Sequence, residues 1–326
     1  MAFPFDILDI TMKEVQMRTK ALALLAIAAA FSVVSASAAA QQWPNKPVRI
    51  IVPYPPGGGT DIQARLLSAA FQKSMGHNFL IDNRTGASGL IGTQIAVDAP
   101  PDGDTILFAS GSISVVVTLF AKRIKFDIHN DLTPISWISS TPLVLTVHPS
   151  VPAKTVPQLI ALAKKHPEGM NATGNAAGTT AHLSGEMLNQ IAGLKTTILT
   201  YRGGGPAVIA LISGEADYGF TTAPSIMPHL KSGKARGLAV TTPKRSSALP
   251  DLPTMNTFYP DFEADNWYAM FYQKGTPRPI IDKMNAEIKK ALTTPEIKAF
   301  YTKEALDAVA SSPEELSSLV KRDVPK

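Results

Sequence analysis

Three glycine-rich segments carry the residue types best suited to holding an anion. They are residues 53–61 (PYPPGGGTD), 173–180 (TGNAAGTT) and 201–206 (YRGGGP). Each follows a short β-branched run and precedes a helical pattern, so its backbone amides would open a helix, where partial positive charge favours an anion. None is a Walker loop, because no Gly-Lys-Ser/Thr follows the glycines. Each turn alone is equally well explained as an ordinary helix start; facing one another across a cleft, they would form a carboxylate site.

Patterns for catalysis or metal binding are missing from the sequence. The six histidines are dispersed, with no pair four residues apart and no His-Glu-x-x-His. There is no Gly-x-Ser-x-Gly, and the absence of cysteine excludes thiolate catalysis and disulfides. His182 alone falls near a glycine-rich turn, and we favour a packing role for it. Trp267 and Tyr268 are candidates for an aromatic wall of the cleft, but we favour core packing for them as well. We therefore expect no enzyme, no catalytic residue, no metal and no cofactor.

The composition fits a two-domain protein without a nucleic-acid partner. A chain of 326 residues with 45% hydrophobic content can bury two modest cores. The net charge is only +5, and no run of Lys and Arg exceeds two residues. A nucleic-acid-binding surface needs a basic stripe, so none is predicted.

The N-terminus is typical of an exported protein. Residues 1–40 contain basic positions, then the apolar run 21–34 and the small-residue stretch 35–40, which is the order of a secretory signal peptide. A membrane-spanning helix is the alternative, but the alanine-rich run lacks a basic stop-transfer flank. Acidic residues near the start indicate that translation can begin at Met17 instead. We expect cleavage of the signal and a periplasmic location.

Strand and helix patterns alternate along the rest of the chain, which predicts an α/β fold with parallel sheets flanked by helices. The first series is 48–52, 61–74, 79–81, 89–97, 105–109 and 113–120, and the second is 142–147, 156–165, 171–173, 181–191, 197–199, 206–213 and 218–220. A proline-rich loop at 241–261 precedes a strand at 267–271 and helices at 280–292 and 295–301. Because a closing segment of this kind often returns to the first lobe, we expect lobe 1 to comprise 41–143 plus 265–326, and lobe 2 to comprise 144–264.

An ordered set of motifs resembles the Bug-type solute receptors of tripartite tricarboxylate transporter systems. The motifs are WPNKPVRIIV at 43–52, GGGTD at 57–61, NRTGASGLIG at 83–92, PDG at 101–103, GN at 174–175, YRGGGPA at 201–207, LAVT at 238–241 and GTP at 275–277. The resemblance spans nearly the whole mature chain, and it implies a two-lobed, type II-like periplasmic binding fold with the ligand cleft between the lobes and no cofactor.

The resemblance also implies which residues contact the ligand. In that family a carboxylate is held largely by backbone amides of the first glycine-rich turn and its counterpart in the other lobe. Carried onto this chain, lobe 1 supplies Tyr54, Gly58, Gly59, Thr60, Asp61 and Ser110, and lobe 2 supplies Asn175, Thr179, Thr180, Tyr201, Arg202 and Thr221. Two roles are left open for Arg202: a structural one, or a salt bridge to the carboxylate.

The expected function is capture of a small carboxylate and its delivery to the membrane permease subunits of a tripartite transporter. Thr221 and Thr222 stand where many relatives have an acidic or amide pair, so a plain or aromatic carboxylate is favoured over an amino acid. The alternative is a carboxylate-sensing receptor that acts on a two-component sensor. We expect a monomer, as the simplest state for a protein that opens, closes and docks.

Overall fold

The computed structural model describes residues 43–166 and 169–324. The predicted signal peptide and the alternative start at Met17 lie outside the described residues. Residues 46–326 form one compact unit, and the fold below is that of its described residues. Among the described residues, no helix is both long and apolar enough to cross a membrane.

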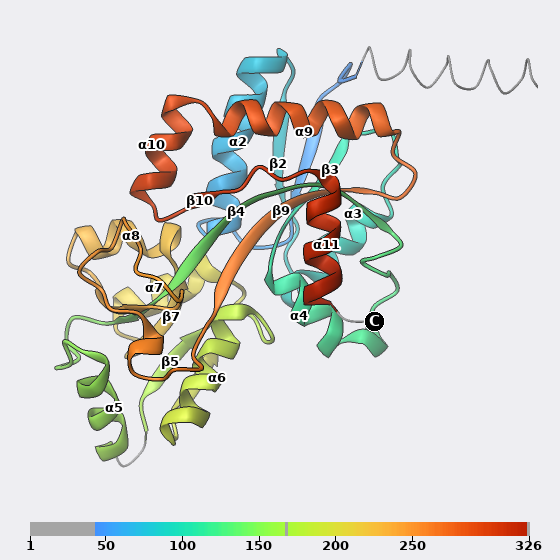
Figure 1. Cartoon of the computed structure of the whole chain (residues 1–326). Helices are drawn as coiled ribbons and strands as arrows, with labels where there is room; N and C mark the ends of the chain where they lie inside the picture. The colour runs from blue at the N-terminus through green and yellow to red at the C-terminus, as the bar shows by residue number, and fades with distance from the viewer. Residues whose placement is uncertain (1–42, 167–168, 325–326) are drawn as a thin grey trace, which may run out of the picture. The chain divides into compact units, whose positions relative to one another are not determined.

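The strands of this unit form two groups, and the long strand β4 runs through both, as Figure 1 shows. The first group is β1 (Val48–Val52), β2 (Phe79–Asn83), β3 (Thr105–Ser110), β9 (Asp265–Gln273) and β10 (Asp307–Ala308). The second group is β5 (Asn171–Gly174), β6 (Thr197–Thr200), β7 (Tyr218–Thr222) and β8 (Arg236–Val240). β4 (Leu132–Val147) pairs with β9 and β10 in its first half and with β7 and β8 in its second.

Each lobe combines parallel strands with antiparallel crossing strands. The orders β2-β1-β3 and β6-β5-β7 are parallel, as the alternation of strands and helices predicts. The crossing strands β4 and β9 pair antiparallel with their neighbours. They connect the lobes and are not part of a strand-helix-strand unit, so the rule that makes such strands parallel does not apply to them. The two-lobed α/β fold is thus confirmed, with a mixed sheet. The exact lobe limits at 143/144 and 264/265 stay a prediction, since β4 passes unbroken through both groups.

Helices cover the faces of both groups of strands. Around the first lie α2 (Gly59–Met75), α3 (Leu90–Val97), α4 (Ser112–Leu119), α9 (Arg278–Leu292), α10 (Pro295–Lys303) and α11 (Pro313–Asp323). Around the second lie α5 (Val156–Lys165), α6 (Thr180–Ala192), α7 (Gly204–Ser213) and α8 (Ala223–Lys231). Short 3₁₀ turns occur at Ala87–Gly89, Ala121–Arg123 and Met255–Thr257. The segment after residue 264 thus contributes β9, β10, α9, α10 and α11 to the first group of strands and its helices.

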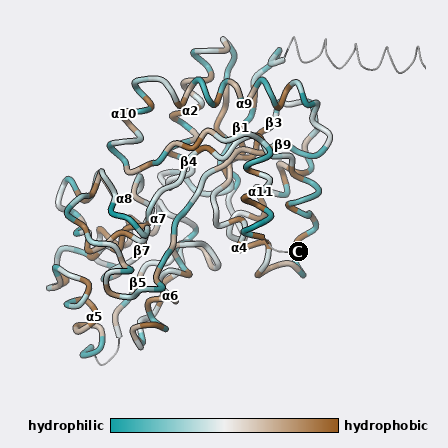
Figure 2. The backbone as a smooth tube through the Cα atoms, in the orientation of Figure 1, coloured by the Kyte–Doolittle hydropathy of each residue, from teal (hydrophilic) through white to brown (hydrophobic). Residues whose placement is uncertain are grey.

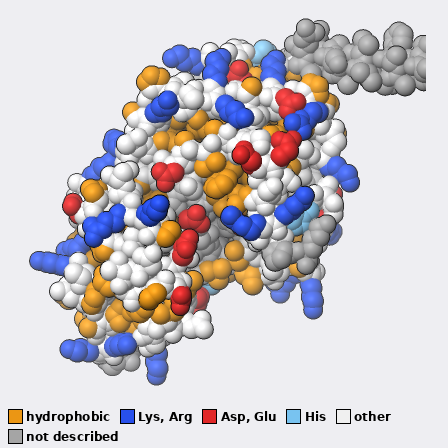
Figure 3. All heavy atoms as spheres, viewed as in Figure 1, with side chains coloured by type: hydrophobic (Ala, Val, Ile, Leu, Met, Phe, Trp, Pro, Cys, Tyr) orange, Lys and Arg blue, Asp and Glu red, His pale blue; other side chains and the backbone are white. Residues whose placement is uncertain are grey.

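Each lobe has an apolar core of its own. Ile51, Leu107 and Leu316 are fully or almost fully buried in the first, where α11 packs on the strands. Leu145 and Leu188 are fully buried in the second. Figure 2 shows helices such as α11 alternating between hydrophobic and hydrophilic residues, the pattern of one buried and one solvated face. Figure 3 shows Lys and Arg scattered over the visible face without forming a stripe.

Two elements of the second lobe were not anticipated. α8 contains Pro228 in its interior and Pro224 in its first turn, and prolines normally argue against a helix. β8 follows it directly and pairs with β4. The strand predicted at 142–147 is the second half of β4, whose first half, from Leu132, carries the polar and proline residues that hide a strand pattern.

Candidate functional site

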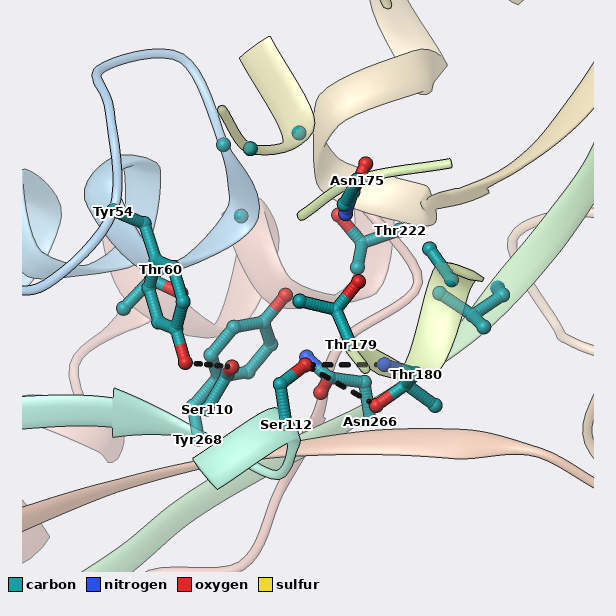
Figure 4. A pocket seen from close by; sticks show the side chains of 16 residues that line it. Tyr54, Thr60, Ser110, Ser112, Asn175, Thr179, Thr180, Thr222, Asn266 and Tyr268 are labelled. Carbon is teal, nitrogen blue, oxygen red and sulfur yellow. Dashed lines mark hydrogen bonds between the residues drawn. The ribbon is translucent and has the colours of Figure 1, made fainter. Parts of the chain in front are cut away.

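A cavity of about 40 Å³ lies between the two lobes, where strands end and helices begin. Figure 4 shows the side chains that surround it. Its lining is Tyr54, Gly58, Gly59, Thr60, Ser110, Ser112, Leu143, Asn175, Thr179, Thr180, Ala181, Gly203, Gly204, Thr222, Asn266 and Tyr268. All three glycine-rich turns contribute to it, so turns that are up to about 150 residues apart in the sequence do converge on one cleft.

Five helix N-termini open onto this pocket. The residues that precede the first turns of α2, α4, α6, α7 and α8 are Gly58, Gly111, Thr179, Gly203 and Thr222, and none makes a side-chain capping hydrogen bond. Among the helices that begin away from the pocket, α5 and α11 are capped by Thr155 and Ser312, whereas α3, α9 and α10 also lack a side-chain cap. A helix N-terminus carries about half a positive charge, with backbone amides pointing outward. The convergence therefore creates a positive potential that favours an anion.

The pocket lining contains no charged side chain. Its polar groups are hydroxyls and amides, including the two neutral tyrosines; burial raises the pKa of Tyr54 and of Tyr268 further, to about 12. Tyr54 accepts a hydrogen bond of 3.1 Å from the Ser110 hydroxyl. An anion bound here would be held by backbone amides and neutral donors, without a salt bridge.

Close packing of glycines brings the first and third turns together. A Cβ atom at Gly205 would overlap the carbonyl oxygen of Pro56, and one at Gly203 would lie 2.5 Å from Cδ of Pro55. At Gly59 a Cβ would overlap the Tyr268 hydroxyl and lie 2.9 Å from Oγ1 of Thr222. Glycine is thus required at these places so that the backbone of one lobe can approach the other.

Side chains also join the lobes beside the pocket. The Ser112 hydroxyl of lobe 1 accepts a hydrogen bond of 3.2 Å from the Thr180 amide, and lies 3.3 Å from the Thr180 hydroxyl. In the surface hollow next to Tyr201 and Arg202, the Ser88 hydroxyl donates to the carbonyl of Ala177 at 2.7 Å. Together with the glycine contacts, these bonds hold the two lobes against each other.

Most of the predicted ligand contacts lie in this pocket. The structure brings together Tyr54, Gly58, Gly59, Thr60, Ser110, Asn175, Thr179 and Thr180. Asp61, Tyr201, Arg202 and Thr221 do not line it. Whether any of the twelve contacts a ligand stays a prediction.

Asp61 stabilises the first turn. Its carboxylate accepts hydrogen bonds from the Gly57 amide at 3.0 Å, from Asn83 at 3.0 Å and from Arg65 at 3.0 Å. Burial alone would raise the pKa of Asp61, but these hydrogen bonds outweigh it and hold the pKa below its usual value. The carboxylate is therefore ionised and committed to shaping the turn.

The other three residues outside the lining face elsewhere. Tyr201 and the exposed Arg202 border a separate surface hollow, and the Tyr201 hydroxyl donates to Glu215 at 2.8 Å. Thr221 is buried on β7, one residue before Thr222. Since neighbouring strand residues point to opposite faces, Thr222 reaches the pocket and Thr221 does not.

Several lining residues were not predicted. They are Ser112, Leu143, Ala181, Gly203, Gly204, Thr222, Asn266 and Tyr268. Ser112 begins α4 directly after β3, so the strand-then-helix pattern that identified the three glycine-rich turns could also have identified Ser112.

The core role expected for Trp267 fits its burial among apolar residues of lobe 1 and its indole N–H bond to Asp323 at 2.9 Å. Tyr268 was also assigned to the core; it is buried but faces the pocket.

No metal centre is apparent in the described part of the chain. Residues 43–166 and 169–324 contain no group of three or more His, Asp or Glu side chains placed to hold an ion. His182 lies beside the pocket, 3.8 Å from Glu186 on the same helix.

Comparisons with known proteins extend over nearly the whole described fold. The model of a family described as tripartite tricarboxylate transporter family receptor matches residues 63–326. Protein BugT of Bordetella pertussis (strain Tohama I) is 33% identical over 308 residues, covering 94% of this chain and 94% of that protein. The structure of the periplasmic binding protein BugD has 30% identity and a TM-score of 0.83, covering 87% of this chain and 95% of that one. An R. palustris protein with adipate also has 30% identity and a TM-score of 0.83, covering 86% and 95%.

Proposed function

Because the chain belongs to the tripartite tricarboxylate transporter receptor family, we propose that it is a periplasmic solute-binding protein that captures a small carboxylate and delivers it to a membrane permease. The observation that carries the ligand class is the convergence of five uncapped helix N-termini on a pocket without charged side chains. Such a site favours an anion and offers a cation no counter-charge. The related R. palustris protein with adipate supports the same class.

Backbone amides can supply enough affinity for a receptor. A carboxylate held by about four charge-assisted hydrogen bonds gains ~1.5–3 kcal/mol from each. After the cost of association, a dissociation constant of about 1 μM, equivalent to about 8 kcal/mol, is within reach. The neutral lining also allows release, since no buried ion pair has to be broken.

Delivery requires a difference between ligand-bound and ligand-free shapes. The pocket takes residues from both lobes, so a carboxylate bound there would favour the arrangement in which the lobes touch. β4 and β9 are the two strands that run between the lobes and would act as the hinge. A permease could then recognise the closed form.

A thermal-shift screen of the purified protein tests the ligand class. The panel contains mono-, di-, tri- and aromatic carboxylates, with the corresponding primary amides as uncharged controls of the same shape, plus sugars and amines. A ligand at 100 times its dissociation constant stabilises the native state by about 2.7 kcal/mol, so a shift of several degrees is expected for one carboxylate class. Shifts caused by sugars, amines or the amides in place of the acids would contradict the proposal.

Delivery is tested in cells. Deleting the gene should abolish uptake of the radiolabelled carboxylate found in the screen, and a plasmid copy should restore it. If uptake persists while a carboxylate-induced transcriptional response disappears, the protein is a sensory receptor and the transport proposal is wrong.

A further inference from the structure

An apolar groove of about 550 Å³ lies on lobe 1, outside the ligand pocket. It is formed by the start of α3 and the segment 120–126 that follows α4, and its large apolar residues are Leu90, Ile91, Phe120, Ile124 and Phe126. Ile91 is 50% exposed, and Leu119, next to the groove, is 57% exposed. Large apolar side chains gathered around a surface groove are a mark of an interaction site.

The charged side chains of the groove are all basic. Arg123 and Lys125 are exposed members of its lining, which contains no Asp or Glu among the described residues. Neither forms an ion pair within the described part of the chain, although the Arg123 guanidinium lies over the Phe120 ring, 5.9 Å from its centroid. Two unpaired cations beside apolar walls are complementary to a partner segment that combines apolar and acidic side chains.

One end of the groove is a turn with left-handed backbone. All four residues from 86 to 89 have positive φ angles, and two of them, Ala87 (45°) and Ser88 (57°), are not glycine. Both of these line the groove. Alanine and serine rarely adopt such angles, and strained segments of this kind gather at binding sites and switch regions.

The same end of the groove contacts lobe 2. The Ser88 hydroxyl donates to the carbonyl of Ala177 at 2.7 Å. Beside it, a Cβ atom at Gly178 would lie 2.8 Å from Cδ1 of Leu119, so the two lobes also pack closely at the end of α4. Opening of the lobes would break these contacts. A partner that binds the groove and the adjoining turn would therefore bind the closed form more tightly than the open form.

We propose that this groove is the surface on which the membrane permease docks, through an apolar segment that carries acidic side chains, and that docking favours the closed form. This inference rests on the proposed delivery function. A lipid surface fits less well, because insertion into a membrane needs an apolar face that protrudes, whereas a groove receives a protruding segment. In a symmetric dimer the groove would face its own copy, which brings like charges together.

A pair of charge reversals tests the docking surface. Arg123→Glu reverses a cation of the groove, and Lys122→Glu makes the same change one residue earlier in the same 3₁₀ turn, outside the lining. Each is placed in the plasmid copy that restores uptake to the deletion strain. We expect Arg123→Glu to lower uptake of the carboxylate at least about tenfold, and Lys122→Glu to stay within about twofold of the wild type.

A second pair of variants tests the apolar walls. Ile91 and Leu80 are 50% and 54% exposed on lobe 1, but only Ile91 lines the groove. Ile91→Glu should lower uptake as Arg123→Glu does, and Leu80→Glu should not. None of the four substituted residues lines the ligand pocket, so isothermal titration should give the wild-type carboxylate affinity for each. Ligand-free melting curves verify folding, and either pair is sufficient where a variant of the other does not fold.

Photo-crosslinking in cells identifies the occupant of the groove. With p-benzoylphenylalanine in place of Ile91, we expect a product with a permease subunit that becomes more abundant when the carboxylate is supplied. The same group in place of Leu80 should give no such product. A product with a second copy of this chain, or with lipid alone, would overturn the proposed occupant.

The outcomes separate docking from the proposed function. If groove variants and controls support equal uptake, docking at this groove is wrong, while capture and delivery of the carboxylate stand. A loss of uptake that is matched by an equal loss of carboxylate affinity also overturns docking, because the groove then acts on the ligand pocket. If deletion of the gene leaves uptake unchanged, delivery itself is wrong, and the docking inference fails with it.

Discussion

Substitution of Gly205 by alanine should block closure of the lobes without damaging either one. Gly205 is the second residue of α7, and a Cβ there would overlap the carbonyl oxygen of Pro56 in the opposite lobe. It would also lie 3.3 Å from the Pro56 carbonyl carbon and 3.4 Å from that of Gly57. These are backbone atoms that cannot turn away, so the two turns must separate.

The expected loss of affinity follows from the contacts that closure provides. A ligand that keeps the contacts of one lobe only loses about half of some four charge-assisted hydrogen bonds, at ~1.5–3 kcal/mol each. The total of about 3–6 kcal/mol corresponds to at least about a hundredfold weaker binding. The helix itself should not suffer, because alanine within a helix is favoured over glycine by about 0.5–1 kcal/mol.

Gly204→Ala is the matched control. It makes the same change one residue earlier in α7, where the added Cβ would lie 3.5 Å from the Gly58 Cα, an ordinary van der Waals distance. Isothermal titration with the carboxylate found in the screen measures affinity, and small-angle scattering with and without ligand measures closure. We expect weak binding and no compaction for Gly205→Ala, with much smaller changes for the control. Equal affinities of the two variants, both with normal compaction, would refute the reasoning.

Three further predictions concern Ser88, Arg202 and the buried tyrosines. Ser88→Ala removes the hydrogen bond to lobe 2 and should speed ligand dissociation about two- to tenfold in stopped-flow experiments; an unchanged rate would show that this bond does not hold the lobes together. Arg202→Ala should leave the titrated affinity almost unchanged, because the side chain is outside the pocket lining; a loss as large as that of Gly205→Ala would restore Arg202 as a ligand contact. Burial raises the pKa of Tyr54 and Tyr268 from 10.0 to about 12, so the folded state keeps protons that the unfolded state loses between these values. The free energy of unfolding, measured with urea, should therefore fall as the pH rises from 10 to 12, and Tyr54→Phe should fall less steeply.

The parts of the site that could be predicted are those with a local signal. Gly58 and Thr179 stand between a strand pattern and a helix pattern, so each is recognisable as a helix start. The backbone amides of a helix start favour an anion regardless of which other elements lie nearby. The parallel order within each lobe follows from the same alternation. These features need no knowledge of which elements meet in space.

The parts that could not be predicted depend on tertiary contacts. Asn266 and Tyr268 reach the pocket only because β9 crosses between the lobes beside β4, and in sequence they look like ordinary members of a buried strand. Arg202 adjoins a glycine-rich turn, yet its backbone direction places the side chain at the surface. Thr221 and Thr222 have the same residue type, and only the strand's register decides which one faces the pocket.

The most direct test of the central claim is a crystal structure with the carboxylate that gives the largest thermal shift. The account predicts that the ligand's carboxylate oxygens lie within about 3 Å of backbone amides at the starts of helices from both lobes, among them α2 and α7, with no charged side chain in contact. A carboxylate paired with Arg202 at the surface, or one bound to a single lobe at a distance from the glycine-rich turns, would contradict it.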